Sequence, residues 1–161
     1  MQKLIVLLRD LFLGGLMSQE SRLEILIARS SASKKMIYFL EKIDAETIGM
    51  GSGSTIKMFI NDLSEDILRK KCFYSTSYDT TIELRRRGAR CVETYLPPER
   101  IDLYVDSADE IDRRGNLLKG GGGALFREKI VAYSSEKRFI IADQEKIVDR
   151  IGARGRIPVE I

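Results

Sequence analysis

Residues 119–129 read Lys-Gly-Gly-Gly-Gly-Ala-Leu-Phe-Arg-Glu-Lys, a basic residue and four glycines that lead into a helical pattern. Residues without a Cβ allow positive φ angles and let a ligand approach the main chain closely. From Ala124 onward, apolar residues recur at positions 126, 130 and 133, which predicts a helix whose amino end opens directly off the glycines. Unpaired N–H groups at such an end favour an anion.

Two charged residues flank this predicted loop. Lys119 precedes the glycines, and Glu128 lies about one turn into the helix, on a face with small and apolar neighbours. We expect the two side chains to bracket one site. The alternative is a structural turn with a solvated Lys and Glu, but four glycines in a row carry a conformational-entropy cost that needs a reason.

A predicted strand with carboxylates at its end comes before the loop. Residues 101–106 alternate apolar and polar side chains, and Ser-Ala-Asp-Glu comes next. Asp106 and Asp109 therefore lie at the carboxyl end of a strand, where open α/β sheets bind their ligands. Two carboxylates without further ligands make a poor metal site, so hydroxyl binding is favoured over a divalent cation. The alternative is a turn in which Asp109 caps the next segment of the chain.

A second glycine-rich loop lies earlier in the chain. Residues 47–50 form a short apolar run, residues 51–55 read Gly-Ser-Gly-Ser-Thr, and a helical pattern begins at Ile56. A strand, glycine loop and helix in this order offer N–H groups and hydroxyls to a phosphate. The loop matches neither the Walker motif nor the dinucleotide fingerprint. The alternative is a plain turn with capping Ser and Thr side chains.

The rest of the chain alternates in the same way. We predict helices over residues 20–42, with a possible break near Ser30, and over residues 80–87. Strands are predicted over residues 71–75, 91–93 and 138–142 and from residue 157 onward. Pro97-Pro98 indicates a loop. Arg85, Arg86 and Arg87 are explained by the carboxyl end of their own helix rather than by nucleic-acid binding, since no aromatic residues are interleaved. The alternation predicts a Rossmann-like α/β fold: a mostly parallel sheet with helices on both faces.

Composition narrows the possible chemistry. The 161 residues predict one domain, and the chain contains no histidine, which excludes Ser-His-Asp and Cys-His triads and HExxH zinc sites. The net charge of +3 is spread along the chain and suits an anionic small molecule as well as nucleic acid. Cys72 and Cys91 form no CxxC pair and are interpreted as buried thiols in a reducing compartment.

Residues 1–17 are apolar but interrupted by Arg9 and Asp10. Neither a membrane-spanning helix nor a signal peptide fits this pattern. We interpret the segment as a leader or non-native extension ahead of a domain that covers residues 18–161.

Several motifs together resemble one enzyme family. Taken in order, Gly51–Thr55, Val105–Glu110, Lys119–Ala124, Arg127–Lys129 and Ile157–Glu160 resemble ribose-5-phosphate isomerase of the A type, from about residue 47 to the end. The resemblance implies a metal-independent, cofactor-free aldose–ketose isomerase that interconverts ribose 5-phosphate and ribulose 5-phosphate in the non-oxidative pentose phosphate pathway. It also implies a cytoplasmic protein, a homodimer or homotetramer at full length, with no nucleic-acid or membrane partner.

The resemblance also implies residue roles. By the resemblance, Glu128 is the proton-transferring base. From the chemistry of the reaction, we expect Lys119 to stabilise the oxyanion, Asp106 and Asp109 to hold hydroxyls and assist ring opening, and the hydroxyl loop with Lys146 to bind the phosphate. The full set of implied substrate-binding residues is Ser52, Gly53, Ser54, Thr55, Asp106, Ser107, Ala108, Asp109, Lys119, Gly120, Gly121, Gly122 and Lys146.

Three departures from the family pattern leave alternatives open. Ser107 stands where the family usually has Gly, and Ser52 stands where Thr is usual. The family also continues beyond the Pro-Val-Glu motif into a lid domain, so residues 18–161 are interpreted as a C-terminally truncated catalytic domain. The alternatives are a non-catalytic sugar-phosphate-binding module and an inactive truncated remnant. A related deaminase is disfavoured because those enzymes use a histidine, and a CoA transferase because the Lys-Gly-Gly-Gly-Gly run points away from it.

Overall fold

The computed structural model describes residues 4–7, 19–93 and 100–160. Six strands form one sheet in which every neighbouring pair is parallel. Their spatial order is β1 (Leu4–Leu7), β8 (Ser135–Ile141), β5 (Ile101–Asp106), β2 (Thr47–Met50), β3 (Cys72–Ser75) and β4 (Arg90–Glu93). The predicted parallel α/β sheet is therefore confirmed.

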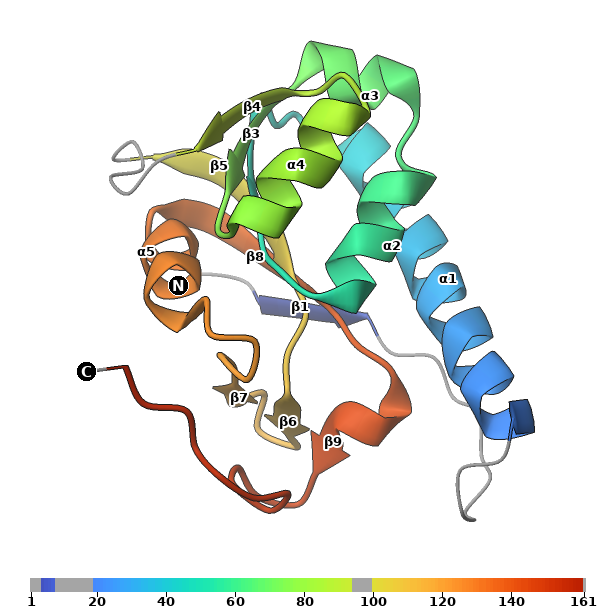
Figure 1. Cartoon of the computed structure of the whole chain (residues 1–161), viewed down its shortest axis with the longest axis vertical. Helices are drawn as coiled ribbons and strands as arrows, with labels where there is room; N and C mark the ends of the chain where they lie inside the picture. Colours follow the sequence, from blue (N-terminus) through green and yellow to red (C-terminus); the bar gives the residue numbers. More distant parts are fainter. Residues whose placement is uncertain (1–3, 8–18, 94–99, 161) are drawn as a thin grey trace.

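Helices cover both faces of this sheet (Figure 1). One face carries α1 (Gln19–Lys42), α2 (Ser54–Asp62), α3 (Glu65–Lys70) and α4 (Tyr78–Arg86), and the other carries α5 (Leu125–Tyr133). Strand β5 shows how the faces divide, because side chains alternate along a strand. Leu103 and Val105 belong to the core under α1, α2 and α4, whereas Tyr104 packs with Val131 of α5.

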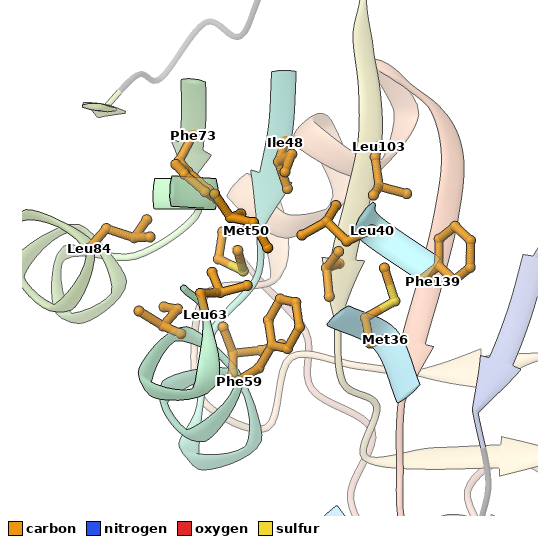
Figure 2. Close-up of a cluster of buried hydrophobic side chains, with 14 of the residues drawn as sticks. Met36, Leu40, Ile48, Met50, Phe59, Leu63, Phe73, Leu84, Leu103 and Phe139 are labelled. Carbon is orange, nitrogen blue, oxygen red and sulfur yellow. The ribbon is translucent and has the colours of Figure 1, made fainter. Parts of the chain in front are cut away.

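The larger core lies between the sheet and the first four helices (Figure 2). Met36 and Leu40 of α1, Phe59 of α2 and Phe73 of β3 are completely buried there. Burial of each such side chain stabilises the fold by about 1.5–3 kcal/mol. The apolar stripe of α2, at residues 56, 59, 60 and 63, is the one that the sequence pattern predicts.

A second, smaller sheet was not predicted. It consists of β7 (Leu117–Leu118), β6 (Glu110–Asp112) and β9 (Ile147–Val148), with β6 antiparallel to β7 and parallel to β9. Figure 1 shows it beyond the end of β5. Lys119 comes directly after β7, and Lys146 ends the short 3-10 helix Gln144–Lys146 that precedes β9. The small sheet therefore fixes two of the predicted site lysines.

The boundaries of several elements differ from the predictions. Helix α1 runs without a break through Ser30, and α3, which Ser64 caps, was not predicted. Further along α1, the buried Ser33 hydroxyl donates to Asp62 Oδ2 of α2 at 2.7 Å, so this serine does not compete for the backbone of its own helix. Strands β4 and β8 and helix α4 begin earlier than predicted, and residues 157–160 form no strand. Pro97-Pro98 lies outside the described residues.

The arginine run at the end of α4 has a partner on another helix. The Arg87 guanidinium donates to the backbone carbonyls of Asn61 at 2.6 Å and Leu63 at 2.8 Å. It therefore binds the carboxyl end of α2, whereas the sequence interpretation placed all three arginines at the end of their own helix.

The two cysteines are free and half-buried rather than buried. In the register of β3 and β4, Cys72 is opposite Arg90 and Cys91 is opposite Phe73. Because neighbouring positions on a strand point to opposite faces, the two thiols lie on different sides of the sheet.

Part of the amino-terminal segment belongs to the main sheet. Strand β1 pairs with β8 from Leu4 opposite Arg138 to Leu7 opposite Ile141. The interpretation of residues 1–17 as an extension, and the domain boundary at residue 18, remain predictions. Among the described residues, no helix has the length and apolar character needed to cross a membrane.

Candidate active site

The two predicted ligand loops meet in the middle of the sheet. The chain proceeds from β2 outward to β3 and β4, then returns to place β5 on the other side of β2. Open α/β sheets bind ligands at such a reversal, at the carboxyl ends of the strands. Met50 and Val105 are opposite each other at these ends, so the loop after β2 begins beside Asp106. The Gly51 N–H donates to the Val105 carbonyl at 2.9 Å.

Gly51 is required by this close approach. A Cβ added at this position would lie 1.9 Å from both Cγ and Oδ1 of Asp106. No side chain fits between the loop and the carboxylate, so the glycine allows Asp106 to reach the loop backbone.

Asp106 is fully buried and accepts four donors. Its Oδ1 accepts the N–H groups of Ser107 at 2.7 Å and Ser52 at 3.2 Å. Its Oδ2 accepts the Tyr104 hydroxyl and lies 2.5 Å from Lys119 Nζ. Burial raises the pKa of Asp106 to about 6, although Lys119 and the Tyr104 hydroxyl favour the ionised form.

Lys119 lies between two carboxylates. Its Nζ donates to the Ser107 carbonyl at 2.5 Å and is 3.3 Å from Glu128 Oε2, besides its contact with Asp106. Burial disfavours the charged amine, but the two carboxylates outweigh this effect and raise the pKa of Lys119 above its usual value. A protonated amine is therefore held at the centre of the site.

Glu128 projects from the first turn of α5 and is 5% exposed. Its Oε1 accepts the Ser52 hydroxyl at 2.6 Å. Its Oε2 is buried and accepts no hydrogen bond from the described residues, with Lys119 Nζ as its nearby cation. One oxygen is thus fixed by the loop, and among the described residues the other has only its ion pair with Lys119.

The face of α5 that packs on the sheet is not the one that carries the predicted apolar residues at positions 126, 130 and 133. Phe126 is 56% exposed and Tyr133 is 73% exposed, while Glu128 and Val131 are buried. Val131 packs over Tyr104 and close to Gly49, where an added Cβ would lie 2.4 Å from Val131 Cγ1. The close contact at Gly49 therefore turns Glu128 inward.

The glycine run makes a tight turn between β7 and α5. Gly120 has a φ of 102°, and the Gly123 N–H donates to its carbonyl at 2.9 Å. The Gly121 N–H donates to Asp109 Oδ2 at 2.8 Å. Asp109 is thereby connected to the loop that carries Lys119.

The amino end of α5 receives an anion from the protein itself. The Phe126 N–H donates to Glu160 Oε2 at 2.9 Å, and the cap residue Ala124 has no side chain that could serve. Glu160 belongs to the motif at residues 157–160, so this motif contacts the helix that carries Glu128.

All the predicted site residues line one cavity of about 130 Å³. These are Ser52, Gly53, Ser54, Thr55, Asp106, Ser107, Ala108, Asp109, Lys119, Gly120, Gly121, Gly122, Glu128 and Lys146. Their juxtaposition is a finding, and their individual roles remain predictions. Within the described residues, no group of three or more His, Cys, Asp or Glu side chains could hold a metal ion.

Three residues of this site were missed. Tyr104 is two residues before Asp106, so strand alternation places both on one face and could have identified it. Glu160 lies in a recognised motif but had no role. Arg29, on α1, also lines the cavity, and its partner Asp143 is 114 residues away, so no local pattern identifies it.

Comparisons with known proteins agree on one family. The family model of ribose 5-phosphate isomerase A (phosphoriboisomerase A) matches residues 72–161, more than half of the chain. The chain is 41% identical over 119 residues to ribose-5-phosphate isomerase A of Korarchaeum cryptofilum, covering 73% of this chain and 52% of that protein. It is 40% identical over 120 residues to ribose-5-phosphate isomerase of Dictyostelium discoideum, covering 73% of this chain and 51% of that protein.

Solved structures share the fold. Ribose 5 phosphate isomerase A from Neisseria gonorrhoeae superposes with a TM-score of 0.69 at 38% identity, covering 77% of this chain and 54% of that one. A D-ribose-5-phosphate isomerase in complex with phospho-erythronic acid superposes with a TM-score of 0.72 at 29% identity, covering 81% and 57%. The chain spans about half the length of the curated relatives that it matches. On the match over residues 72–161, the chain belongs to the ribose 5-phosphate isomerase A family.

Proposed function

We propose that this protein interconverts ribose 5-phosphate and ribulose 5-phosphate, as an aldose–ketose isomerase of the non-oxidative pentose phosphate pathway. The observation that carries the proposal is the cavity-lining carboxylate of Glu128, whose buried Oε2 accepts no hydrogen bond from the described residues and lies 3.3 Å from the ammonium of Lys119. A base beside a fixed cation is what proton abstraction next to a carbonyl requires.

The reaction needs one proton carrier. Glu128 Oε2 takes the proton from carbon 2 of the open-chain aldose, and the electrons of that bond form the enediolate. The same carboxyl returns the proton to carbon 1, while the hydroxyl proton passes from O2 to O1. Ser52 holds Oε1 at 2.6 Å and so orients Oε2 toward the substrate.

Lys119 stabilises the negative oxygen of the enediolate. A preorganised donor of this kind contributes about 3–4 kcal/mol to transition-state stabilisation. A carboxylate has about four acceptor positions, and the four donors to Asp106 occupy them. We therefore assign to Asp106 the positioning of Lys119, and to Asp109 the contact with sugar hydroxyls and ring opening.

The phosphate is assigned to the other end of the cavity. Helix α2 begins after Gly53 without a side-chain cap, which leaves its first N–H groups for an anion. Ser54, Thr55 and Lys146, which offer two hydroxyls and an amine, also line the cavity. A related isomerase was solved with phospho-erythronic acid, a phosphorylated sugar acid, which supports this ligand class. The cytoplasmic location and the homodimer or homotetramer remain predictions.

Proton exchange tests the proposal. The purified chain is incubated with ribose 5-phosphate in D₂O containing EDTA, and both sugars are monitored by NMR. We expect ribulose 5-phosphate to form with deuterium at carbon 1, because the carboxyl group that holds the abstracted proton exchanges it with solvent during some turnovers. A chain that binds ribose 5-phosphate but leaves the carbon-bound protons in place would instead be a sugar-phosphate-binding module.

A further inference from the structure

We propose that Thr80 of α4 is a positioning residue for the isomerase reaction. Its hydroxyl fixes the peptide group between Gly51 and Ser52, and Ser52 in turn holds the base Glu128. The proposal rests on the proposed function, because the group that it positions is the proton carrier of that reaction. Thr80 itself is 1% exposed, is not one of the cavity-lining residues and belongs to none of the recognised motifs.

The peptide group between Gly51 and Ser52 is held at both of its ends. At one end, the Thr80 hydroxyl donates to the Gly51 carbonyl at 2.8 Å. At the other end, the Ser52 N–H donates to Asp106 Oδ1 at 3.2 Å. Because a peptide group is planar, its C=O and its N–H turn together. The hydrogen bond from Thr80 therefore also fixes the direction of the Ser52 N–H.

The single hydroxyl proton of Thr80 is committed to the loop. The Ser77 hydroxyl donates to Thr80 Oγ1 at 2.8 Å, and the Thr80 N–H donates back to Ser77 Oγ at 3.1 Å. Since a carbonyl can only accept, the proton of Thr80 must point to Gly51. Ser77 is the amino-terminal cap of α4. The loop is thus connected to the first turn of a helix that packs against the core.

Packing leaves room for this peptide to turn. Glycine allows backbone rotation more readily than any other residue, and glycines stand at positions 51 and 53. A Cβ added at Gly53 would meet no atom within 4 Å. Residues 52–54 also border a second cavity of about 380 Å³, which Ser77 and Tyr78 of α4 line as well. The hydrogen bond to Thr80, rather than close packing, is therefore what holds the peptide on this side.

A turn of this peptide would affect both carboxylates of the site. Ser52 contacts Asp106 through its N–H and holds Glu128 Oε1 through its hydroxyl at 2.6 Å. Rotation removes the first contact and carries the hydroxyl away from Glu128. Proton transfer depends steeply on the placement of the base. Loss of the Thr80 hydroxyl should therefore lower kcat, while the first turn of α2 and Lys146 still bind the substrate.

The alternative is that Thr80 only stabilises the fold. Thr81 provides a matched control, because it is equally buried and follows Thr80 on the same helix. Its hydroxyl contacts Ser75 Oγ at 2.5 Å and the Ser77 carbonyl at 3.1 Å, and neither atom belongs to the loop. A structural role predicts similar effects of Thr80→Val and Thr81→Val, whereas a positioning role separates them.

The first experiment measures kcat and KM for ribose 5-phosphate, each corrected for the folded fraction of the enzyme. We expect Thr80→Val, which keeps the branched shape but lacks the donor, to lower kcat about 10- to 100-fold with little change in KM. Thr80→Ser retains the donor and should recover most of kcat, and Thr81→Val should keep the wild-type value. Equal kcat in Thr80→Val and Thr81→Val, or no recovery in Thr80→Ser, would overturn the proposal.

The second experiment follows solvent exchange of the Ser52 amide by NMR without substrate. We expect this N–H to exchange about 10-fold faster in Thr80→Val than in wild type or Thr81→Val, the effect of one lost hydrogen bond. An unchanged rate would refute the proposal. If Thr80→Val does not fold, Ser77→Ala takes its place, since it removes the donor that directs the Thr80 proton, and it must change kcat and exchange in the same directions.

The two experiments also separate this inference from the proposed function. Faster exchange of the Ser52 amide in Thr80→Val of a chain without isomerase activity would refute the proposed function and leave the positioning of the loop by Thr80 standing. Isomerase activity that is the same in wild type, Thr80→Val and Thr81→Val would support the proposed function and refute the inference.

Discussion

At the scale of single residues, the site is a closed ring of polar contacts. Lys119 bridges Asp106 and Glu128, Ser52 joins Glu128 through its hydroxyl, and Ser52 returns to Asp106 through its N–H. Each charged side chain in the ring already has a polar partner within the protein when no substrate is bound. Preorganisation of this kind avoids the reorganisation that water would need during the reaction.

Tyr104 should set the pH at which the site becomes active. It donates to Asp106, and burial raises its own pKa well above the usual value, so it stays protonated. The role proposed for Asp106 needs its ionised form to hold Lys119, so activity should fall as pH drops through about 6. Tyr104→Phe removes a donor to the ionised form, which raises the pKa of Asp106 further. The acidic limb of kcat/KM should move upward by about 0.5–1 pH unit.

The measurement is the pH profile of kcat/KM for wild type, Tyr104→Phe and the control Tyr133→Phe. The substrate phosphate also titrates near pH 6, but equally in all three enzymes, so the difference reports the protein. Tyr133 is 73% exposed on the outer side of α5, and its variant should behave as wild type does. A limb in Tyr104→Phe that stays in place or moves to lower pH would contradict the role given to this hydroxyl.

At the scale of elements, helix α5 connects the chemistry to the rest of the chain. Its inner face carries Glu128 and packs on β5 through Val131, and its amino end accepts Glu160 from the last described segment. The apolar pattern at positions 126, 130 and 133 correctly predicted the helix, but Phe126 and Tyr133 lie on its solvent-exposed face. Periodicity shows that a helix exists, and the close contact at Gly49 decides which side faces the sheet.

Glu160 should stabilise this helix in the manner of an amino-terminal cap. Because Glu160 is exposed, we expect Glu160→Ala to lower the free energy of unfolding by only about 0.5–1 kcal/mol. Amide hydrogen exchange in the first turn of α5 should become faster. Both quantities are measured beside Glu41→Ala, an exposed glutamate on α1. Equal protection of the α5 amides in Glu160→Ala and Glu41→Ala would show that the contact contributes nothing.

At the scale of the whole molecule, the fold places the site and was largely predictable. Alternating strands and helices indicate a parallel sheet, and such a sheet brings the loops after β2 and β5 together. The small sheet was not predictable, since its strands of two or three residues carry no periodic signal. The contact of Arg29 with Asp143 joins positions 114 residues apart, and only the folded chain shows it.

The central claim is that Glu128 carries the proton. The most direct test is the steady-state conversion of ribose 5-phosphate by the wild-type chain and by Glu128→Gln, which keeps the size and the contact with Ser52. We predict that Glu128→Gln lowers kcat by about 10²- to 10⁴-fold with little change in KM, because it removes proton transfer and leaves the binding groups. A Glu128→Gln enzyme with wild-type kcat would contradict the account.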